Sequence, residues 1–441
     1  MKVAVIGGGI SGLTAAYKLS QQGAEVTLLE RNTSLGGLAA SFDTGNYWLE
    51  KYYHFVCGGD FGLFRLIEEL GISEELHWNF SETSFFYEGK LYPFRGSLDL
   101  FRFSPLSFFS RIRFGLSVLY ARYMKNWQRL DKIPAREWLI KIIGEQAYQV
   151  IWEPLLRIKF GHYHDQISAA WLCHRIHRIS QSRPHWWEKE KMGYMTGGSK
   201  TLMDRLSQKI STQGGKIHLN TPVSQILAQN DRVTGIEFGG ERHSFDKVVA
   251  AIPIPRLIRL LPENTGPLTT QFTESLLKIN YIGVVCMVLR LKHSITDYFW
   301  VNINDFSLSI NGIIEYTNLN PCPRLQGDKI VYVPFYLPTT EARYTYSSPQ
   351  LYEEYCRALA KINPDFDTSW VVDYRVFRNP YAQAICTTDF WQKIPQCKTP
   401  LTNFYFLDSI HIYPEDHTLS GMARLAYEVS DLVLEKNVFR K

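Results

Sequence analysis

The N-terminal segment begins as an apolar run, breaks at a cluster of glycines and continues with apolar residues at helical spacing. Residues 2–6 predict a short buried strand, and residues 25–29 predict a second strand after Gly23. Between them, apolar side chains recur about one helical turn apart, at Ile10, Leu13, Ala16, Tyr17 and Leu19. The pattern therefore predicts a strand, a tight turn, a helix and a second strand that ends at Glu30.

The glycines of this turn have the spacing of a dinucleotide-binding motif. Gly7 allows the turn, Gly9 lets the backbone approach a pyrophosphate, and Gly12 lets the helix pack closely on the strand. Ile10 and Ser11 open the helix, whose positive end favours an anion. A carboxylate at the end of the second strand suits the two hydroxyls of an adenosine ribose and repels a 2′-phosphate. Glu30 therefore favours an adenosine without that phosphate.

Apolar patterns farther along the chain predict more elements of the same kind. Apolar positions between 202 and 210 predict a helix, and residues 247–252 predict a buried strand that is stopped by two prolines. Residues 403–407 predict a strand ending at Asp408, with a helix starting near 418. Two longer apolar runs, 281–289 and 329–336, predict strands of a separate sheet.

Composition limits the class of protein. The chain has 441 residues, 45% of them apolar, which is enough for two or three domains. No apolar stretch reaches the length of a membrane span, so we expect a cytoplasmic protein. The seven cysteines are scattered and lack C-x-x-C spacing, which argues against a disulfide framework and a metal site. The mild net charge of +5 and the lack of a recognised module argue against nucleic-acid binding.

One segment accounts for the whole excess of positive charge. From Leu100 to Leu130 there is no acidic residue, whereas aromatic residues alternate with the cations Arg102, Arg111, Arg113, Arg122, Lys125 and Arg129. Such a segment suits peripheral docking on anionic lipid. The alternative is an ordinary helix of a substrate domain with a solvated basic side.

The segment that follows Glu30 resembles the corresponding segment in the flavoprotein superfamily of amine oxidases, protoporphyrinogen oxidases, phytoene desaturases and UDP-galactopyranose mutases. There, an acid followed by a glycine pair supports the FAD pyrophosphate from its other side, and here Arg31 is followed by Gly36, Gly37 and Leu38. The resemblance implies FAD and an α/β fold, with a Rossmann-like FAD-binding domain of the glutathione-reductase, two-dinucleotide-binding type. No second G-x-G-x-x-G follows, which argues against a separate NAD(P)H domain.

The resemblance also implies how the domains are divided. We expect a discontinuous FAD-binding domain, 1–81, 194–261 and 397–441, and a substrate domain with a helical part at 82–193 and a sheet part at 262–396. In the superfamily, a valine at the position of Val223 packs beside the adenine. An acid at the position of Asp408 faces the ribityl and phosphate part of FAD, although Leu407 stands where the family has glycine. The helix that begins near Thr418, Leu419 and Ser420 is implied to point at the flavin pyrimidine.

Residues near the flavin are implied by the same likeness. The segment containing Tyr52, Tyr53 and His54 resembles the histidine-bearing segment that passes the flavin face in UDP-galactopyranose mutases. His54 is our leading catalytic candidate, and a packed structural histidine is the alternative. Arg157 and Lys159 are candidates for binding an anionic group, or else cap a helix end. Cys386 stands near the place where monoamine oxidases join the flavin, but ordinary strand packing fits it better.

Taken together, the sequence predicts an FAD-dependent oxidoreductase. The expected reaction is a two-electron dehydrogenation of a hydrophobic, sometimes anionic substrate of isoprenoid or tetrapyrrole type, with oxygen or a quinone as electron acceptor. A second hypothesis is a mutase that rearranges a nucleotide sugar without net redox change. A third is a carrier like the Rab GDP-dissociation inhibitors, against which the intact glycines, Glu30 and Asp408 argue.

Overall fold

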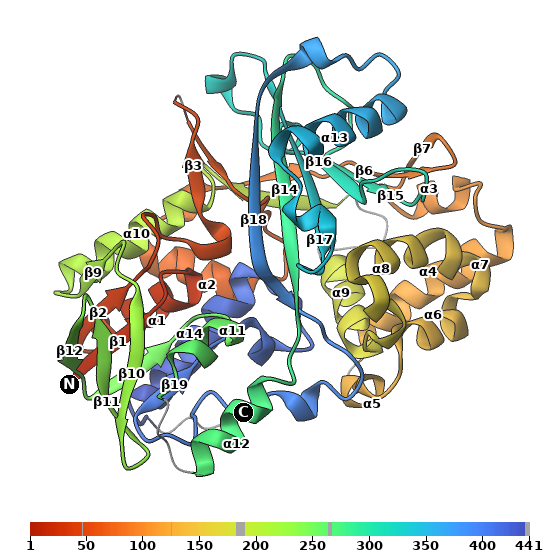
Figure 1. Cartoon of the computed structure of the whole chain (residues 1–441). Coiled ribbons are helices and arrows are strands. Elements are labelled where there is room, and N and C mark those ends of the chain that lie inside the picture. The colour runs from red at the N-terminus through yellow and green to blue at the C-terminus, as the bar shows by residue number, and fades with distance from the viewer. Residues whose placement is uncertain (46, 125, 182–189, 263–266, 437–441) are drawn as a thin grey trace.

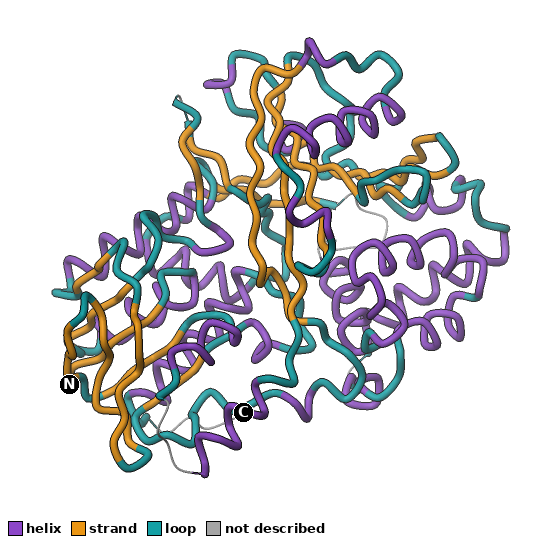
Figure 2. The backbone as a smooth tube through the Cα atoms, viewed as in Figure 1, coloured by secondary structure: helices purple, strands orange, loops and turns teal. Residues whose placement is uncertain are grey.

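The computed structural model describes residues 1–45, 47–124, 126–181, 190–262 and 267–436. Figure 1 shows strands and helices packed together at the N-terminal side, a long mixed sheet in the middle and a group of helices beyond it. Figure 2 shows strands at the N-terminal side and in the middle of the molecule, and a group of helices on the far side of the central sheet. The α/β class predicted from the sequence is confirmed.

A five-stranded sheet, parallel throughout, lies on the side of the molecule that contains the N-terminus. Three separated segments of the chain supply it, in the order β19 (Phe404–Phe406), β13 (Lys247–Ala250), β1 (Lys2–Ile6), β2 (Glu25–Leu29) and β9 (Lys216–His218). The predicted strand, turn, helix and strand at the N-terminus are confirmed. The strand predicted over 247–252 is shorter, because Pro253 opens a helical turn, α11 (Ile254–Leu257).

Side chains on β1 alternate between two cores, as the period of a strand requires. Val3 and Val5 face a layer of helices, whereas Ala4 and Ile6 face a three-stranded antiparallel sheet. The helices are α1 (Ile10–Gln21), α2 (Phe61–Leu70), α10 (Ser199–Thr212) and α14 (Leu419–Val433), and the small sheet is β10 (Val223–Gln229), β11 (Arg232–Phe238) and β12 (Glu241–Ser244). Covering both faces buries β13 and β19 completely and β1 except for Lys2, whereas the edge strand β9 stays partly exposed.

A seven-stranded mixed sheet forms the middle of the molecule. Its order is β18 (Val371–Ala384), β14 (Tyr281–Leu291), β17 (Lys329–Leu337), β16 (Gly312–Glu315), β15 (Trp300–Ile303), β6 (Thr83–Tyr87) and β7 (Lys90–Pro93). The two strands predicted in the C-terminal insertion are thus β14 and β17. Along β14, Val285, Met287 and Leu289 face one core, and Cys286 and Val288 face another.

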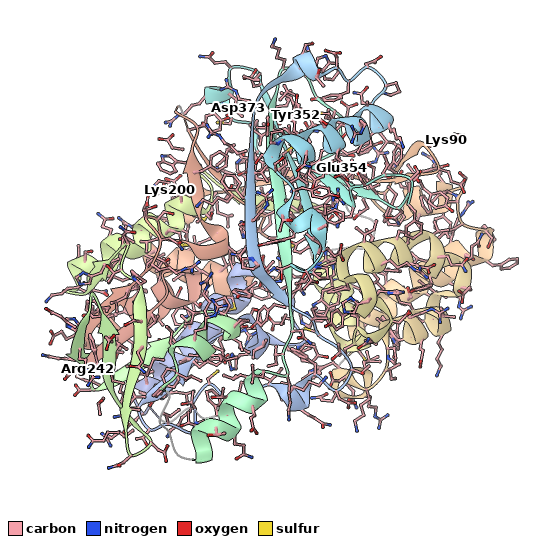
Figure 3. The ribbon with its side chains drawn as sticks, in the orientation of Figure 1. Lys90, Lys200, Arg242, Tyr352, Glu354 and Asp373 are labelled. Carbon is pink, nitrogen blue, oxygen red and sulfur yellow. The ribbon has the colours of Figure 1, made fainter. Side chains whose placement is uncertain are left out.

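Helix α13 (Ser348–Ile362) covers one face of this sheet. In Figure 3, Tyr352 and Glu354 lie on α13 above the strands. The Tyr352 ring stacks on Tyr374 of β18 with 4.5 Å between ring centroids, and Glu354 pairs with Arg343 at 2.8 Å. The opposite face receives residues 47–55, which include β4 (Trp48–Glu50), and Tyr332 of β17 donates a hydrogen bond to the Glu50 carbonyl at 2.9 Å.

Region 82–193 is not purely helical, contrary to our expectation. Its first strands, β6 and β7, join the seven-stranded sheet through a tight hairpin whose turn residues, Glu88 and Gly89, both have positive φ. Its last strand, β8 (Lys191–Met195), pairs with β5 (Leu76–Phe80). The helices between them are α3 (Ser97–Arg102), α4 (Phe108–Tyr123), α5 (Trp127–Asp131), α6 (Ala135–Ile143), α7 (Glu145–Ala147), α8 (Glu153–Phe160) and α9 (Ala169–Gln181).

The remaining elements join the first sheet to the rest of the chain. β3 (Ser41–Asp43) pairs with β4, and α12 (Pro267–Leu276) precedes β14. The Glu50 carboxylate accepts a hydrogen bond from the Ser199 N–H at the start of α10, at 2.9 Å. Lys200, labelled in Figure 3, lies over the Trp48 ring at 4.6 Å, so α10 is held against the β3–β4 hairpin.

Candidate functional site

The predicted glycine turn lies at the carboxyl end of β1. Gly7 has a φ of +106° and donates its N–H to the Leu29 carbonyl at 2.8 Å, which ties the turn to β2. Gly9 is the N-cap of α1 and supplies no side-chain capping bond, so the N–H groups of Ile10, Ser11 and Gly12 face the open end of the helix. A Cβ atom added to Gly9 would meet no protein atom within 4 Å. This open space at a helix N-terminus fits an anionic group.

The space around Gly12, unlike that around Gly9, leaves no room for a side chain. A Cβ atom at Gly12 would lie 1.9 Å from the Gly7 carbonyl oxygen and 3.2 Å from the Ala251 Cβ atom. The helix therefore approaches the turn as closely as its backbone allows. The three glycines thus have different structural requirements, in line with the roles expected from their spacing.

Glu30 is buried beside the glycine turn at the end of β2. Its carboxylate accepts hydrogen bonds from the Gly8 N–H at 2.7 Å and from the Asn32 N–H at 2.8 Å. Its carbonyl accepts a hydrogen bond from the Thr221 N–H at 2.9 Å, which holds the start of β10, with Val223, next to it. The sheet thereby brings the predicted ribose and adenine residues together, and Arg31 follows on the exposed surface.

The second glycine pair lies against the first turn. Gly36 donates its N–H to the Gly8 carbonyl at 2.8 Å, and a Cβ atom on Gly37 would lie 3.4 Å from the Gly9 Cα atom. Both glycines have positive φ, and Leu38 follows in a short 3₁₀ turn. Two glycine turns on either side of one open helix end form a cradle that fits the pyrophosphate of FAD.

Asp408 is buried at the end of β19 and contacts protein donors with both carboxylate oxygens. Oδ2 accepts hydrogen bonds from the Tyr281 hydroxyl at 2.7 Å and the Ile254 N–H at 3.3 Å, and Oδ1 accepts one from the Ile410 N–H at 3.0 Å. Burial raises the pKa of Asp408, and these hydrogen bonds oppose the rise. In this structure the carboxylate joins β19 to β14 and α11.

The predicted helix near residue 418 is α14. The Thr418 hydroxyl caps it by accepting a hydrogen bond from the Gly421 N–H at 2.9 Å. The Ser420 hydroxyl accepts one from the Leu63 N–H of α2 at 3.2 Å, and Leu419 packs against the helical core. These side chains fix the direction of the helix.

His54 follows β4 in the chain and lies near His417, which is in the loop before α14. Tyr53 packs edge-on against Trp300 with 5.1 Å between ring centroids, and Tyr52 packs in the same aromatic core. Burial lowers the pKa of His54 to about 4, so its imidazole is neutral at pH 7. Its Nδ1 atom is buried and has no hydrogen-bond partner among the described residues. A buried nitrogen of this kind is available to a ligand or a proton.

The structure separates the two basic residues that we expected to act together. Arg157 is exposed and pairs with Glu153 at 2.8 Å on the outer face of α8. Lys159 points the other way, with its ammonium 4.6 Å from the centroid of Tyr336 and 5.1 Å from that of Trp171. Burial lowers the pKa of Lys159 to about 8. Of these two basic residues, only Lys159 lies beside the aromatic side chains Tyr336 and Trp171.

A buried ion pair that the sequence analysis missed lies beside Lys159. Asp416, in the loop before α14, pairs with Arg175 of α9 and accepts a hydrogen bond from the Gln383 side chain at 3.3 Å. Burial favours a higher pKa for Asp416, but Arg175, with His417 and Lys159, holds it well below its usual value. No sequence signal links these residues, because they come from three distant segments.

Arg256 is a second residue that the sequence did not reveal. Arg256 lies in α11, and its guanidinium is 5.5 Å from the centroid of the Tyr381 ring. Burial lowers its pKa, and the positive charge of Arg31 lowers it further. Two neighbouring cations close to the glycine cradle strengthen its suitability for an anion.

Cys386 is buried and forms no disulfide, like the other six cysteines. Burial raises the pKa of its thiol, so the sulfur is protonated at pH 7. Among the described residues, no helix is long and apolar enough to cross a membrane.

Comparison with known proteins shows the family. The chain matches the flavin containing amine oxidoreductases over residues 10–414, and it belongs to that family. It is therefore an FAD-dependent oxidoreductase, as the sequence predicted, and the carrier hypothesis is set aside.

Individual relatives are distant. A 15-cis-phytoene desaturase of Synechococcus elongatus is 26% identical over 293 residues, which are 60% of this chain and 60% of the relative. A putative protoporphyrinogen oxidase from Exiguobacterium superposes with a TM-score of 0.75 at 19% identity, covering 99% of both chains. A reduced UDP-galactopyranose mutase gives a TM-score of 0.75 at 16% identity, over 98% of this chain and 95% of the mutase. The matched part thus spans about three fifths of the desaturase, and the solved structures show the fold alone.

The first prediction from the site concerns Glu30. Glu30→Ala is expected to weaken FAD retention, because it removes the acceptor for a ribose and releases the N–H groups of Gly8 and Asn32. A hydrogen bond to a charged group contributes about 1.5–3 kcal/mol. FAD released by acid from the purified, yellow protein measures the occupancy. Glu25→Ala, on the exposed face of the same strand, is the matched control, and equal occupancy in both variants would show that Glu30 is misassigned.

Proposed function

We propose that this protein dehydrogenates a hydrophobic molecule of isoprenoid or tetrapyrrole type, and that oxygen or a quinone receives the electrons. The observation that carries the proposal is a cluster of aromatic side chains around Lys159, whose ammonium lies 4.6 Å from the centroid of Tyr336 and 5.1 Å from that of Trp171, with Tyr53 and Asp416 close to Tyr336. An aromatic cluster binds extended apolar molecules or flat rings. Similarity to a phytoene desaturase supports a substrate of this kind.

We assign a separate role in the dehydrogenation to each residue of this site. When bound, FAD accepts the two electrons and one hydrogen of the broken C–H bond. A second hydrogen leaves the substrate as a proton, and we assign its acceptance or relay to the neutral His54, whose buried Nδ1 atom has no hydrogen-bond partner among the described residues. We assign binding of an anionic group of the substrate to Lys159, whose charge interacts with those of the Asp416–Arg175 ion pair.

Anaerobic mixing with candidate substrates tests the reaction. We expect a reduced isoprenoid or a hydrogenated tetrapyrrole to bleach the flavin absorbance, and oxygen or a quinone to restore it. The mutase hypothesis rests on the similarity of the His54 segment and on the shared fold. It requires a different result: turnover of a UDP-sugar only after prior reduction by dithionite, with no bleaching by any apolar candidate.

The second prediction distinguishes the role of Lys159 from that of Arg157. Lys159→Met is expected to raise the KM for an anionic substrate by about 10- to 100-fold, because a charge-assisted contact is lost. The KM of the wild type should rise as the pH increases through about 8, where Lys159 loses its proton. Arg157→Met is the control, since Arg157 pairs with Glu153 outside the cluster. If both variants keep the wild-type KM at every pH, Lys159 does not bind the substrate.

A further inference from the structure

Helix α4 has its apolar stripe on the outside. The exposed positions Phe109, Ile112, Leu116, Leu119 and Tyr123 recur at three- and four-residue spacing, which places them on one face. Phe109 is 81% exposed, Leu116 61% and Tyr123 75%. The buried face, by contrast, includes Ser117 and Ala121 beside Phe114. A helix that packs only against its own protein has the reverse arrangement.

Neighbouring side chains extend this apolar surface. Leu98 and Phe101 of α3 are 73% and 49% exposed, and Phe108 at the start of α4 is 60% exposed. Contacts join α3 to α4 and α4 to α9. Figure 1 shows α3 and α4 among the helices on the side away from β1. We call the exposed side chains of residues 98–123 on α3 and α4 the α3–α4 face.

The structure divides the basic residues of this segment into two groups. Arg111 donates to the carbonyls of Leu106 and Phe101, and Arg113 donates to the Ile142 carbonyl at 2.9 Å, so both hold loop and helix ends together. Arg102 and Arg129 are exposed and Arg122 is half-buried, and none forms an ion pair within the described part of the chain. Lys125 lies outside the described residues. Three guanidinium groups therefore remain available beside the α3–α4 face.

We propose that the α3–α4 face docks on a bilayer that contains anionic lipid. Exposed aromatic and aliphatic side chains flanked by cations match the interface of such a bilayer, where rings enter the headgroup region and cations meet phosphates. A second copy of the chain fits less well, because a two-fold contact would bring like-charged guanidinium groups together without a carboxylate between Leu100 and Leu130. The proposal does not depend on the substrate.

Docking would place the bilayer close to the aromatic cluster. Helix α9, on which α4 packs, carries Trp171 and Arg175 to that cluster. A cavity of about 410 Å³ lies between these helices and the loop before α14, with Met124, Trp127 and His174 in its lining. One helix thus separates the α3–α4 face from the site of the proposed reaction.

Co-sedimentation of the FAD-loaded protein with vesicles tests the proposal. We expect binding to vesicles of phosphatidylglycerol and phosphatidylcholine, weaker binding at high salt, and little binding to phosphatidylcholine alone. Phe109→Ser with Leu116→Ser is expected to lower the affinity at least about tenfold, because two exposed apolar anchors are removed. Phe306→Ser with Leu277→Ser is the matched control, since both side chains are exposed, at 61% and 64%, in turns outside α3 and α4.

A second pair of substitutions tests the charges, at two exposed residues that form no ion pair within the described part of the chain. Arg102→Glu with Arg129→Glu should abolish the salt-sensitive part of binding, whereas Arg111 and Arg113 are left unchanged because they stabilise the helices. Melting temperature and FAD content should be unaltered in every variant. Equal sedimentation of the wild type and the Phe109/Leu116 variant overturns the proposal. So does a dimer in solution that this variant dissociates while vesicles bind neither protein.

Discussion

Gly12→Ala is expected to prevent formation of the native FAD-binding fold. The new Cβ atom would lie 1.9 Å from the Gly7 carbonyl oxygen, which is itself part of a turn fixed to β2, so neither partner is free to move. Overpacking of this kind costs roughly 1–3 kcal/mol where the surroundings relax, and more where backbone meets backbone. We expect mostly insoluble protein, and a markedly lower melting temperature and little bound FAD in any soluble fraction.

Gly9→Ala is the matched variant for Gly12→Ala. Gly9 has a φ of −75°, which alanine adopts freely, and its Cβ atom would meet no protein atom within 4 Å. We therefore expect a soluble, well-folded protein with wild-type stability in the absence of FAD but much weaker FAD binding, because the methyl group enters the cradle. Wild-type FAD affinity in Gly9→Ala would mean that the cofactor does not use this space. A stable, yellow Gly12→Ala protein would contradict the close helix packing.

His54→Ala is expected to lower the maximal rate by about 10²- to 10⁴-fold while FAD stays bound. That range is typical of losing a positioned acid, base or orienting group, and the glycine cradle and Glu30 lie elsewhere in the structure. Because burial lowers the pKa of His54 to about 4, its titration should not affect the rate between pH 6 and 8. Rapid mixing with substrate, with the flavin absorbance as readout, separates the chemical step from substrate binding.

A second histidine provides the control for this loss. His77→Ala removes an exposed imidazole whose one hydrogen bond among the described residues is to the Thr196 hydroxyl, at 2.8 Å, and it should keep full activity. His54→Gln should recover part of the rate if the ring mainly orients the substrate, and none if it transfers a proton. Full activity of His54→Ala with every substrate that bleaches the flavin would make His54 a structural residue.

The FAD-binding half could be predicted because its signals are local. Gly7, Gly9, Gly12 and Glu30 are close in sequence, and each is required by backbone geometry or by charge at a strand end. The helix predicted from the apolar positions between 202 and 210 is part of α10, since its apolar face is regular. Strands of the central sheet were found where apolar runs were long, as at Tyr281–Leu291.

The candidate site was only partly predictable because its charges come from distant segments. Arg175 and Asp416 meet through the packing of α9 on the loop before α14, and no spacing in the sequence records that contact. Arg157 and Lys159 looked equivalent as neighbours, but positions two apart point to opposite sides of a helix. The β6–β7 hairpin was overlooked because its Glu88–Gly89 turn lacks the usual asparagine or aspartate before glycine.

The late position of β19 and α14 in the chain has a consequence for biosynthesis. While the ribosome makes residues 1–396, the edge of β13 has no partner and the apolar faces of α1 and α2 that later receive α14 stay in water. Contacts between such distant segments form slowly and leave aggregation-prone surfaces exposed meanwhile. A nascent or prematurely terminated chain would therefore depend on chaperones, and loss of the last strand and helix should send it to proteolysis even though every glycine of the cofactor turn is present.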